Sequence, residues 1–354
     1  MRTTSRQDRP RSRPPKSRRW QRIGIVFGIA VVAATFAFVL PQIADYGEVW
    51  GVVKRLSLKQ IVALLLATLL NLATFAPPWM AALPQLGFRK AFVVTQASTA
   101  STYVAPGGAA LGVALSYGML RSWGLPTRSV ALAAALTGIW NQFALLGFPV
   151  IALALLTLQK EQNAALQTVA MVGLAVFVVA AAGFAVGLST PQLARHVGNT
   201  AARLANRGLR ILRRSPVSWT GESFVRFRNE AVGLLRHRWH VLTLATLAGQ
   251  LSVFVVFLVS LRVLDVSASE VSGVEAFAAW SLVRLLGSLP ITPGGLGVVE
   301  VGLTAALVGF GGANAEVVAA VLLYRFLTIV PTLVLGLVAG ATWRRLKGVR
   351  ARPI

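Results

Sequence analysis

Long apolar runs, separated by short basic segments, make up most of the chain. Because about 20 consecutive apolar residues cross the hydrocarbon core of a bilayer as a helix, the pattern predicts an all-α, polytopic membrane protein. We expect about six spanning helices on this length criterion. They occupy about residues 23–43, 61–83, 130–158, 169–188, 241–264 and 317–341.

Two further apolar regions, 91–120 and 274–310, are each interrupted by a proline followed by two glycines. Neither residue type continues a helix well. Broken backbone in hydrocarbon occurs only where protein or a water-filled cavity covers it. We therefore expect a turn within each region. The turn motifs comprise Pro106, Gly107 and Gly108 in the first region and Pro293, Gly294, Gly295 and Gly297 in the second.

The distribution of positive charge indicates how these two regions meet the membrane. The chain has a net charge of +24, and its Lys and Arg residues concentrate in segments 1–22, 189–240 and 344–354. Segments of this kind stay in the cytoplasm. All three lie there only if 91–120 and 274–310 each return to the side that they left. We therefore predict two re-entrant helical hairpins and cytoplasmic N- and C-termini.

The predicted hairpins open to opposite sides of the membrane, so the two halves of the chain have opposite orientation. Sequence matches support such an inverted repeat, because Leu-Ala-Thr-Leu precedes both breaks, at 66–69 and at 244–247. Inverted repeats are a common plan of transporters. The expected organisation is a disordered basic tail (1–22), a transmembrane domain (23–343) with halves at about 61–188 and 241–343 joined by an Arg-rich cytoplasmic loop (189–240), and a basic tail (344–354).

Glu300, Arg284 and Arg325 are the charged residues that we expect inside the membrane. A lone charge at the bilayer centre costs about 2.5–3.5 kcal/mol on insertion scales, so each one needs a partner. Glu300 and Arg284 lie at similar depth on opposite arms of the second hairpin, and Arg325 could join them. Two interpretations stay open. The charges either form an ion pair that fixes the hairpin, or an arginine binds an anionic lipid group while Glu300 relays protons or competes for that arginine.

Uncharged polar residues inside the expected spans are secondary candidates. Thr292 and Thr304 place hydroxyls near the second turn. The amide side chains are more typical of hydrogen bonds between helices than of substrate binding. These amides are Asn71, Gln96, Asn141, Gln142 and Gln250, of which Asn141 and Gln142 are retained as candidates.

Several functions are disfavoured by what the sequence lacks. It contains no cysteine, which excludes disulfides and thiolate chemistry. Its three histidines lie in the basic segment without a cluster of acids, so we expect no metal site. We find no nucleotide-binding or hydrolase motif and expect no cofactor and no enzymatic activity. Nucleic-acid binding is also disfavoured, because positive-inside topology explains the charge.

The segment Pro290-Ile291-Thr292-Pro293-Gly294-Gly295-Leu296-Gly297-Val298-Val299-Glu300, with Tyr324-Arg325-Phe326, Pro331 and Gly336, resembles the transmembrane region of lysylphosphatidylglycerol synthetases. That family includes stand-alone, flippase-like proteins. The resemblance implies a protein of the inner or plasma membrane that moves a lipid between leaflets. Because the sequence ends at Ile354, we do not expect the synthetase activity of the two-domain relatives.

The resulting expectation is a flippase-like transporter for an anionic, polyprenyl- or phospholipid-type lipid. Its partners would be the bilayer and the transported lipid, and a separate lipid-modifying enzyme is compatible with this expectation. The alternative is a membrane enzyme or accessory protein that acts on a lipid-linked envelope precursor.

Overall fold

The computed structural model describes residues 51, 54–103, 108–158, 164–211, 215, 220–289 and 292–346. These residues form helices and connecting turns without any strand, which confirms the all-α class. The expected tail at 1–22 and span at 23–43 lie outside the described residues, as do Pro106 and Gly107. The described helices are α3 (Leu58–Thr74), α4 (Pro77–Ala82), α5 (Phe88–Thr102), α6 (Gly108–Ser122), α7 (Thr127–Leu158), α8 (Ala164–Ser189), α9 (Pro191–Ile211), α10 (Gly221–Val263), α11 (Gly273–Gly287), α12 (Val298–Gly309) and α13 (Asn314–Thr342), with short 3-10 turns η3 (Pro293–Gly295) and η4 (Trp343–Arg345).

Within the described residues, five helical segments are long and apolar enough to cross a membrane. Each of them overlaps one of the five spans predicted in this part of the chain. In the first segment, Pro77 and Pro78 separate α3 from α4, because proline has no backbone N–H to continue the hydrogen bonds of the helix. The five segments are Leu58–Ala82, Thr127–Leu158, Met171–Ser189, Gly221–Val263 and Asn314–Arg345.

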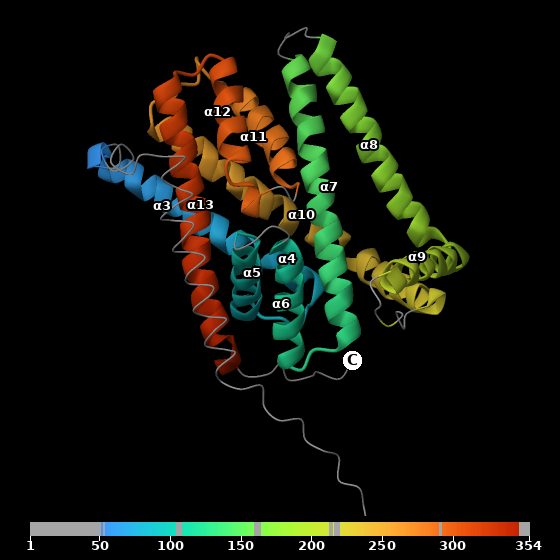
Figure 1. Cartoon of the computed structure of the whole chain (residues 1–354). Coiled ribbons are helices and arrows are strands. Elements are labelled where there is room, and N and C mark those ends of the chain that lie inside the picture. The colour runs from blue at the N-terminus through green and yellow to red at the C-terminus, as the bar shows by residue number, and fades with distance from the viewer. Residues whose placement is uncertain are drawn as a thin grey trace, which may run out of the picture.

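Both interrupted regions fold as helical hairpins. Helices α5 and α6 pack side by side at one end of the bundle, and α11 and α12 do so at the other end (Figure 1). The longest arms have 15 residues, or about 22 Å of helix, which is less than the roughly 30 Å of bilayer hydrocarbon. The predicted bounds 91–120 and 274–310 agree with the observed arms to within three residues.

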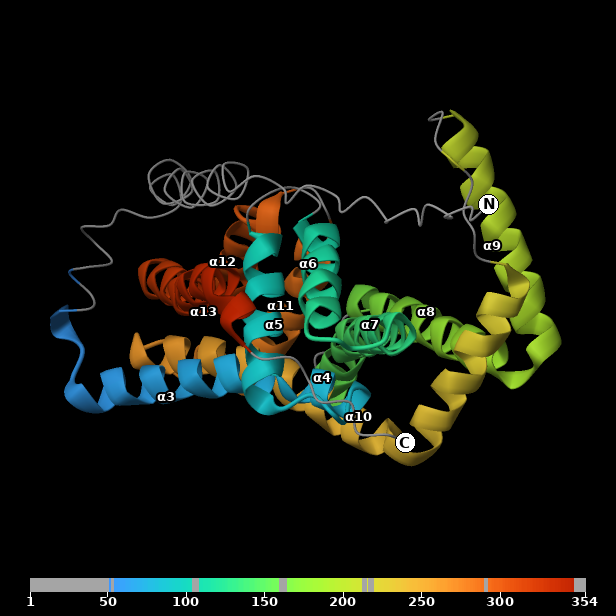
Figure 2. The same cartoon turned by 90° about the horizontal axis from the view of Figure 1, so that it is seen from below.

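The packing of the two halves is reciprocal. The first arm of each hairpin packs against the long helix that follows the hairpin of the other half: α5 against α13, and α11 against α7. Helices α3 and α10, which begin the two halves, run side by side (Figure 2). The order of these helices along the chain and their contacts both follow the pattern expected of an inverted repeat.

The contact between α5 and α13 depends on the absence of a side chain. A Cβ atom at Gly336 would lie 2.2 Å from the Cβ atom of Ala100. The two helices therefore meet at a glycine, which allows their backbones to approach closely.

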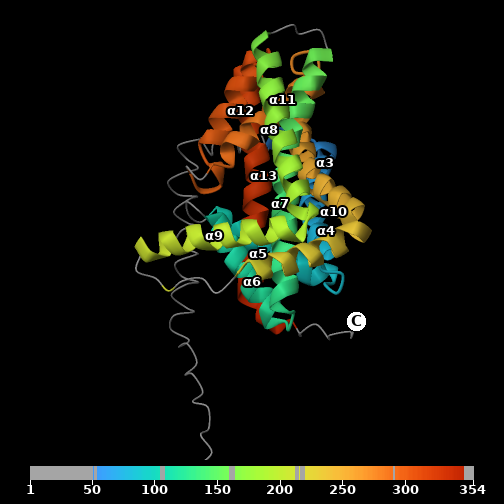
Figure 3. The ribbon, with the colours of Figure 1, turned by 90° about the vertical axis from the view of Figure 1, so that its right-hand side faces the viewer.

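The basic segment 189–240, predicted as the Arg-rich connection between the two halves, is helical over most of its described residues. It consists of α9 and the first half of α10, and α9 lies across the direction of α8 (Figure 3). An ion pair of 2.8 Å between Arg195 and Glu222 joins α9 to α10. Arginine, leucine and alanine favour helix, so the segment can be strongly basic and helical at once.

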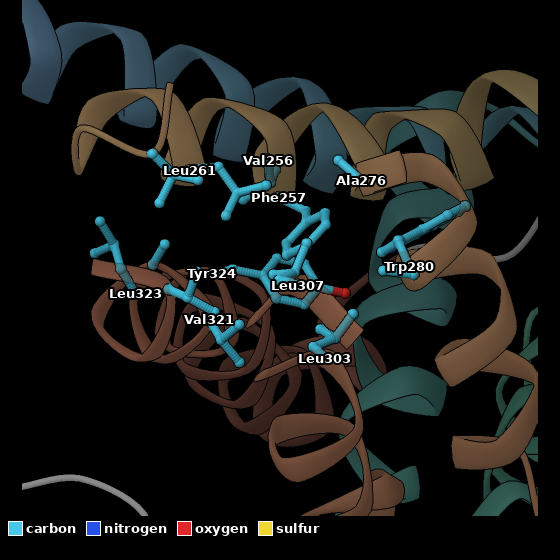
Figure 4. Packing of buried hydrophobic residues seen from close by; sticks show 14 of the residues in the cluster. Val256, Phe257, Leu261, Ala276, Trp280, Leu303, Leu307, Val321, Leu323 and Tyr324 are labelled. Carbon is cyan, nitrogen blue, oxygen red and sulfur yellow. The ribbon is translucent and has the colours of Figure 1, made fainter. Parts of the chain in front are cut away.

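The largest apolar core lies among α10, α11, α12 and α13 (Figure 4). Phe257 of α10 contacts Tyr324 of α13 edge-on, with ring centroids 5.2 Å apart. Leu303 and Leu307 of α12 and Trp280 of α11 pack in the same cluster. This core fixes the second hairpin and places Tyr324 and Trp280 beside the cavity described next.

Candidate functional site

A cavity of about 930 Å³ lies where the two hairpins meet. Tyr103, which ends α5, touches the second hairpin so closely that a Cβ atom at Gly294 would lie 2.1 Å from its ring. The cavity walls come from α3, from both hairpins and from the long helices α7, α8, α10 and α13. Its polar lining residues include Asn141, Gln142, Gln250, Arg284, Thr292 and Arg325.

The cavity reaches the protein surface on one side. Most of its lining is buried or half-buried, but five lining residues are exposed. These residues belong to α6, α7 and the end of α11, so the opening lies between those elements. They are Ala109, Gly138, Gln142, Ser288 and Leu289.

Glu300 forms an ion pair with Arg325, not with Arg284. Both paired residues are buried, with 4% and 9% of their surfaces exposed. The other Glu300 oxygen accepts a hydrogen bond of 2.6 Å from the backbone N–H of Gly297. Arg325 also donates to the carbonyl oxygen of Gly294, at 3.1 Å. The pair therefore ties the turn of the second hairpin to α13.

Local backbone geometry explains why this turn needs glycine. Gly294, Gly295 and Gly297 have φ angles of 58°, 70° and 81°, a region that other residues enter only with strain. With the backbone turned in this way, Glu300 lies in the first turn of α12. There its carboxylate reaches back to the N–H of Gly297 and satisfies a donor at the helix start.

Arg284 has a different environment at the last turn of α11. Its guanidinium donates to Oε1 of Gln250, and Nε2 of Gln250 donates to Oδ1 of Asn141 at 2.8 Å. The guanidinium also lies over the ring of Trp280, 5.1 Å from the centroid. Two interhelical amides and an aromatic ring thus hold Arg284, and no carboxylate among the described residues pairs with it.

The structure brings most of the predicted residues together. Gly108, Gly294, Gly295, Thr292, Asn141, Gln142, Arg284 and Arg325 all line the cavity. Glu300 and Gly297 lie behind its wall, and Pro293 begins the turn η3. Thr304 lies farther along α12 and does not line the cavity.

The amides predicted to join helices do so at four of five positions. Asn71 donates to Ser252 at 3.1 Å and Gln96 donates to the carbonyl of Leu72 at 3.2 Å. Gln250 and Asn141 join α10 to α7. Gln142 is the exception, because its side chain is exposed at the cavity opening.

Three aromatic residues of the site were not predicted. Tyr103 precedes the first Pro-Gly-Gly break, Tyr324 precedes Arg325, and Trp280 lies one helical turn before Arg284. The i to i+4 spacing of Trp280 and Arg284 on a helix is a usable signal, since residues four apart share a face.

No group of three or more histidine or acidic side chains that could hold a metal ion occurs in the part of the chain that the structure describes. What the cavity offers chemically is a set of hydrogen-bond donors, two guanidinium groups and an aromatic wall.

The family model of the Lysylphosphatidylglycerol synthase TM region matches residues 25–336. The chain belongs to this family. The matched range contains both hairpins and the whole cavity, so the site described above lies within the family domain of this membrane protein. No curated protein matches the chain.

Proposed function

We propose that this family member is a lipid transporter that moves a phospholipid- or polyprenyl-type lipid between the leaflets of the cell membrane. One observation carries the proposal: a cavity lined by the buried Arg325 and the half-buried Arg284 lies where two hairpins from opposite ends of the bundle meet. A polar cavity at the midplane, between inverted halves, is where transporters bind their substrates.

The proposed topology places both termini in the cytoplasm and makes both hairpins re-entrant. Support comes from the short arms, which are too short to cross the hydrocarbon core alone, and from the basic α9 and early α10, which positive-inside bias assigns to the cytoplasm. Under this topology the two hairpins enter the membrane from opposite faces.

In the proposed mechanism the headgroup occupies the cavity while the acyl chains remain in the bilayer. The opening between α6, α7 and α11 suits this arrangement, because it is lateral and bordered by exposed apolar residues such as Leu111 and Leu289. One half rocking against the other would expose the cavity to each leaflet in turn. Of the acidic residues that the structure describes, only Glu300 is buried, and it is engaged by Arg325 and Gly297. That engagement supports transport rather than catalysis by this carboxylate.

Filling the cavity tests the transport route. Gly138 lines the cavity, and a Cβ atom there would meet nothing within 4 Å, so Gly138→Phe should fold and obstruct the headgroup path. Gly183→Phe on α8 is the matched control, because Gly183 is equally unobstructed and lies away from the cavity.

The assay is the movement of fluorescent phosphatidylglycerol in proteoliposomes, with dithionite added outside to quench the accessible label. We expect the wild type and Gly183→Phe to move the lipid at similar rates. Gly138→Phe should lower the transport rate by about tenfold or more, because a headgroup that is displaced in the cavity is no longer positioned for movement. Transport no faster than in empty liposomes, across anionic, zwitterionic and polyprenyl lipids, would refute the function.

A further inference from the structure

The two arginines of the cavity differ in what they bind. Arg325 shares its charge with Glu300 and also donates to the carbonyl of Gly294. Arg284 has one hydrogen-bond acceptor within the described residues, the amide oxygen of Gln250. A guanidinium carries five N–H donors, so Arg284 retains both its net charge and most of its donors for a ligand.

Arg284 is also held in place. The Gln250–Asn141 bond anchors its amide partner to α7, and Trp280 supports the guanidinium from one side. A planar, fixed guanidinium suits the two-pronged recognition of a phosphate or carboxylate. Holding a lone cation so firmly inside a membrane is costly unless an anion neutralises it for part of the working cycle.

Two further polar groups of the cavity lack partners. The indole N–H of Trp280 and the hydroxyl of Thr292 are buried and meet no hydrogen-bond partner in the part of the chain that the structure describes. Trp280 is 1% exposed and lines the cavity. A buried donor without an acceptor is destabilising by about 1–3 kcal/mol, and a ligand oxygen in the cavity would satisfy it.

The cavity lining offers no carboxylate to a cationic group. None of its residues that the structure describes is an aspartate or glutamate, and the nearby carboxylate of Glu300 lies behind the wall, bound to Arg325. An ammonium group would enter a site that contains two guanidiniums and no free carboxylate, which is unfavourable in a medium of low dielectric constant.

Resting on the proposed function, we propose that Arg284 is the headgroup contact and that the site selects a lipid with a monoanionic phosphodiester headgroup over its aminoacylated, positively charged ester. The phosphate oxygens would take the free donors of Arg284 and the N–H of Trp280. Arg325 would act on structure alone, by holding the second hairpin.

The test measures binding separately from transport. Purified protein in neutral maltoside detergent is titrated with dioctanoyl phosphatidylglycerol, with its lysyl ester and with soluble glycerol phosphate. The ammonium groups of the lysyl ester would be repelled by the two guanidiniums, and glycerol phosphate lacks acyl chains that bury apolar surface. We therefore expect phosphatidylglycerol to bind at least about tenfold more tightly than either comparison compound.

Variants locate the site. Arg284→Gln should weaken phosphatidylglycerol binding by about tenfold or more, and Arg284→Lys by less, since lysine keeps the charge but loses the fork. Arg345→Gln removes the same charge from an exposed position outside the cavity and should bind as the wild type does. Trp280→Phe keeps the aromatic support and removes only the N–H, so it provides a second, milder variant.

Equal affinity for phosphatidylglycerol and its lysyl ester would overturn the proposal, as would wild-type binding by folded Arg284→Gln. Equal affinity for glycerol phosphate would overturn the assignment to a lipid. If Arg284→Gln does not fold, the wild-type comparison and Trp280→Phe still decide. Lipid binding without lipid movement in proteoliposomes would refute the proposed transport function but not the proposed binding site. Lipid movement without any preference among the lipids would refute the proposed binding site but not transport.

Discussion

The arms of both helical hairpins pack closely at glycines, but the second hairpin also has its turn bound to a helix outside the hairpin. In the first, Gly108 and Gly112 bring α6 so near α5 that an added Cβ atom would lie 2.2 Å and 2.7 Å from backbone oxygens of α5. In the second, a buried ion pair between Glu300 and Arg325 ties the turn to α13. Close packing at glycines also joins the arms of the second hairpin, since Cβ atoms at Gly287 and Gly302 would lie 2.6 Å and 2.9 Å from valine side chains of the facing arm. Charge therefore adds a tie to α13 that the described residues of the first hairpin do not have.

This difference shows how two similar halves of the chain can enclose a cavity whose charged residues come from one half alone. Both hairpins pack against α13, the first along the helix face of α5 at Gly336 and the second through its turn, which Arg325 binds. The second depends on α13, so a change at α13 acts directly on one hairpin turn. The ion pair also removes Arg325 from the set of free cations, which leaves Arg284 as the charged feature of the cavity.

Breaking the ion pair should have the largest effect. Glu300→Gln leaves the Arg325 guanidinium buried without its counter-charge, a loss of about 3–5 kcal/mol in the free energy of unfolding. The measurement is unfolding of purified protein in mixed micelles with increasing SDS, followed by tryptophan fluorescence. The double variant Glu300→Leu with Arg325→Met should lose less than Glu300→Gln, because no lone charge remains. A loss no smaller in the double variant would contradict the role of the pair as a closure of the second hairpin.

The contact between the two turns should come next in size. Gly294→Ala combines a positive φ with a Cβ atom 2.1 Å from the Tyr103 ring, and strain plus overpacking cost about 2–4 kcal/mol. Gly297→Ala is the matched control, because it has a positive φ and nothing within 4 Å. It should lose only the strain part in the same unfolding assay. A loss at Gly294→Ala no larger than that of backbone strain alone, about 1–2 kcal/mol, would mean that the hairpin turns do not touch.

A third variant examines how the first hairpin packs against the other half. Gly336→Ala would push the new methyl group into Ala100 and cost about 1–3 kcal/mol. Gly340→Ala, one turn later on α13, meets nothing within 4 Å and should be neutral or stabilising, because alanine favours helix more than glycine does. Thermal unfolding of the two variants side by side separates packing from helix propensity, and a reversed order would refute the contact.

The smallest effect should come from the polar tie between the arms of the first hairpin. The hydroxyl of Ser101 shares its proton between the carbonyl of Ser98 in its own helix, at 2.6 Å, and the carbonyl of Gly108 on the other arm, at 3.2 Å. A neutral hydrogen bond contributes about 0.5–1.5 kcal/mol, and the longer branch contributes only part of it. Ser101→Ala should therefore lose much less stability than Glu300→Gln. Ser122→Ala, whose hydroxyl bonds only within its own helix, is the control and should change less still. A loss at Ser101 as large as that at Glu300 would erase the distinction between the hairpins.

Much of the fold could be predicted from the sequence. Apolar length fixes the spans, and the Pro-Gly-Gly breaks locate the hairpins because backbone chemistry alone forbids a continuous helix there. The bounds of the helices within 189–240 were not predicted, because apolar length marks only the membrane spans and α9 is strongly basic.

The site was predictable in its members but not in their pairing. Glu300 has two arginines at comparable depth, and spacing along the chain does not decide between them. The choice follows from the turn, where three glycines with positive φ lead into α12 and Glu300 contacts Gly297 and α13. Trp280 and Tyr103 were missed because an aromatic residue in an apolar helix is ordinarily part of the core.

The lone charge of Arg284 has an electrical consequence under the proposed mechanism. With Arg325 neutralised by Glu300, the empty cavity carries one net positive charge, and a bound monoanionic lipid brings it to zero. The membrane potential does work of about 2.3 kcal/mol per elementary charge per 100 mV. Movement of the loaded cavity would therefore be nearly independent of voltage, whereas return of the empty cavity would feel the field. An applied membrane potential would therefore change the rate at which the empty cavity returns, but not the rate at which the loaded cavity moves.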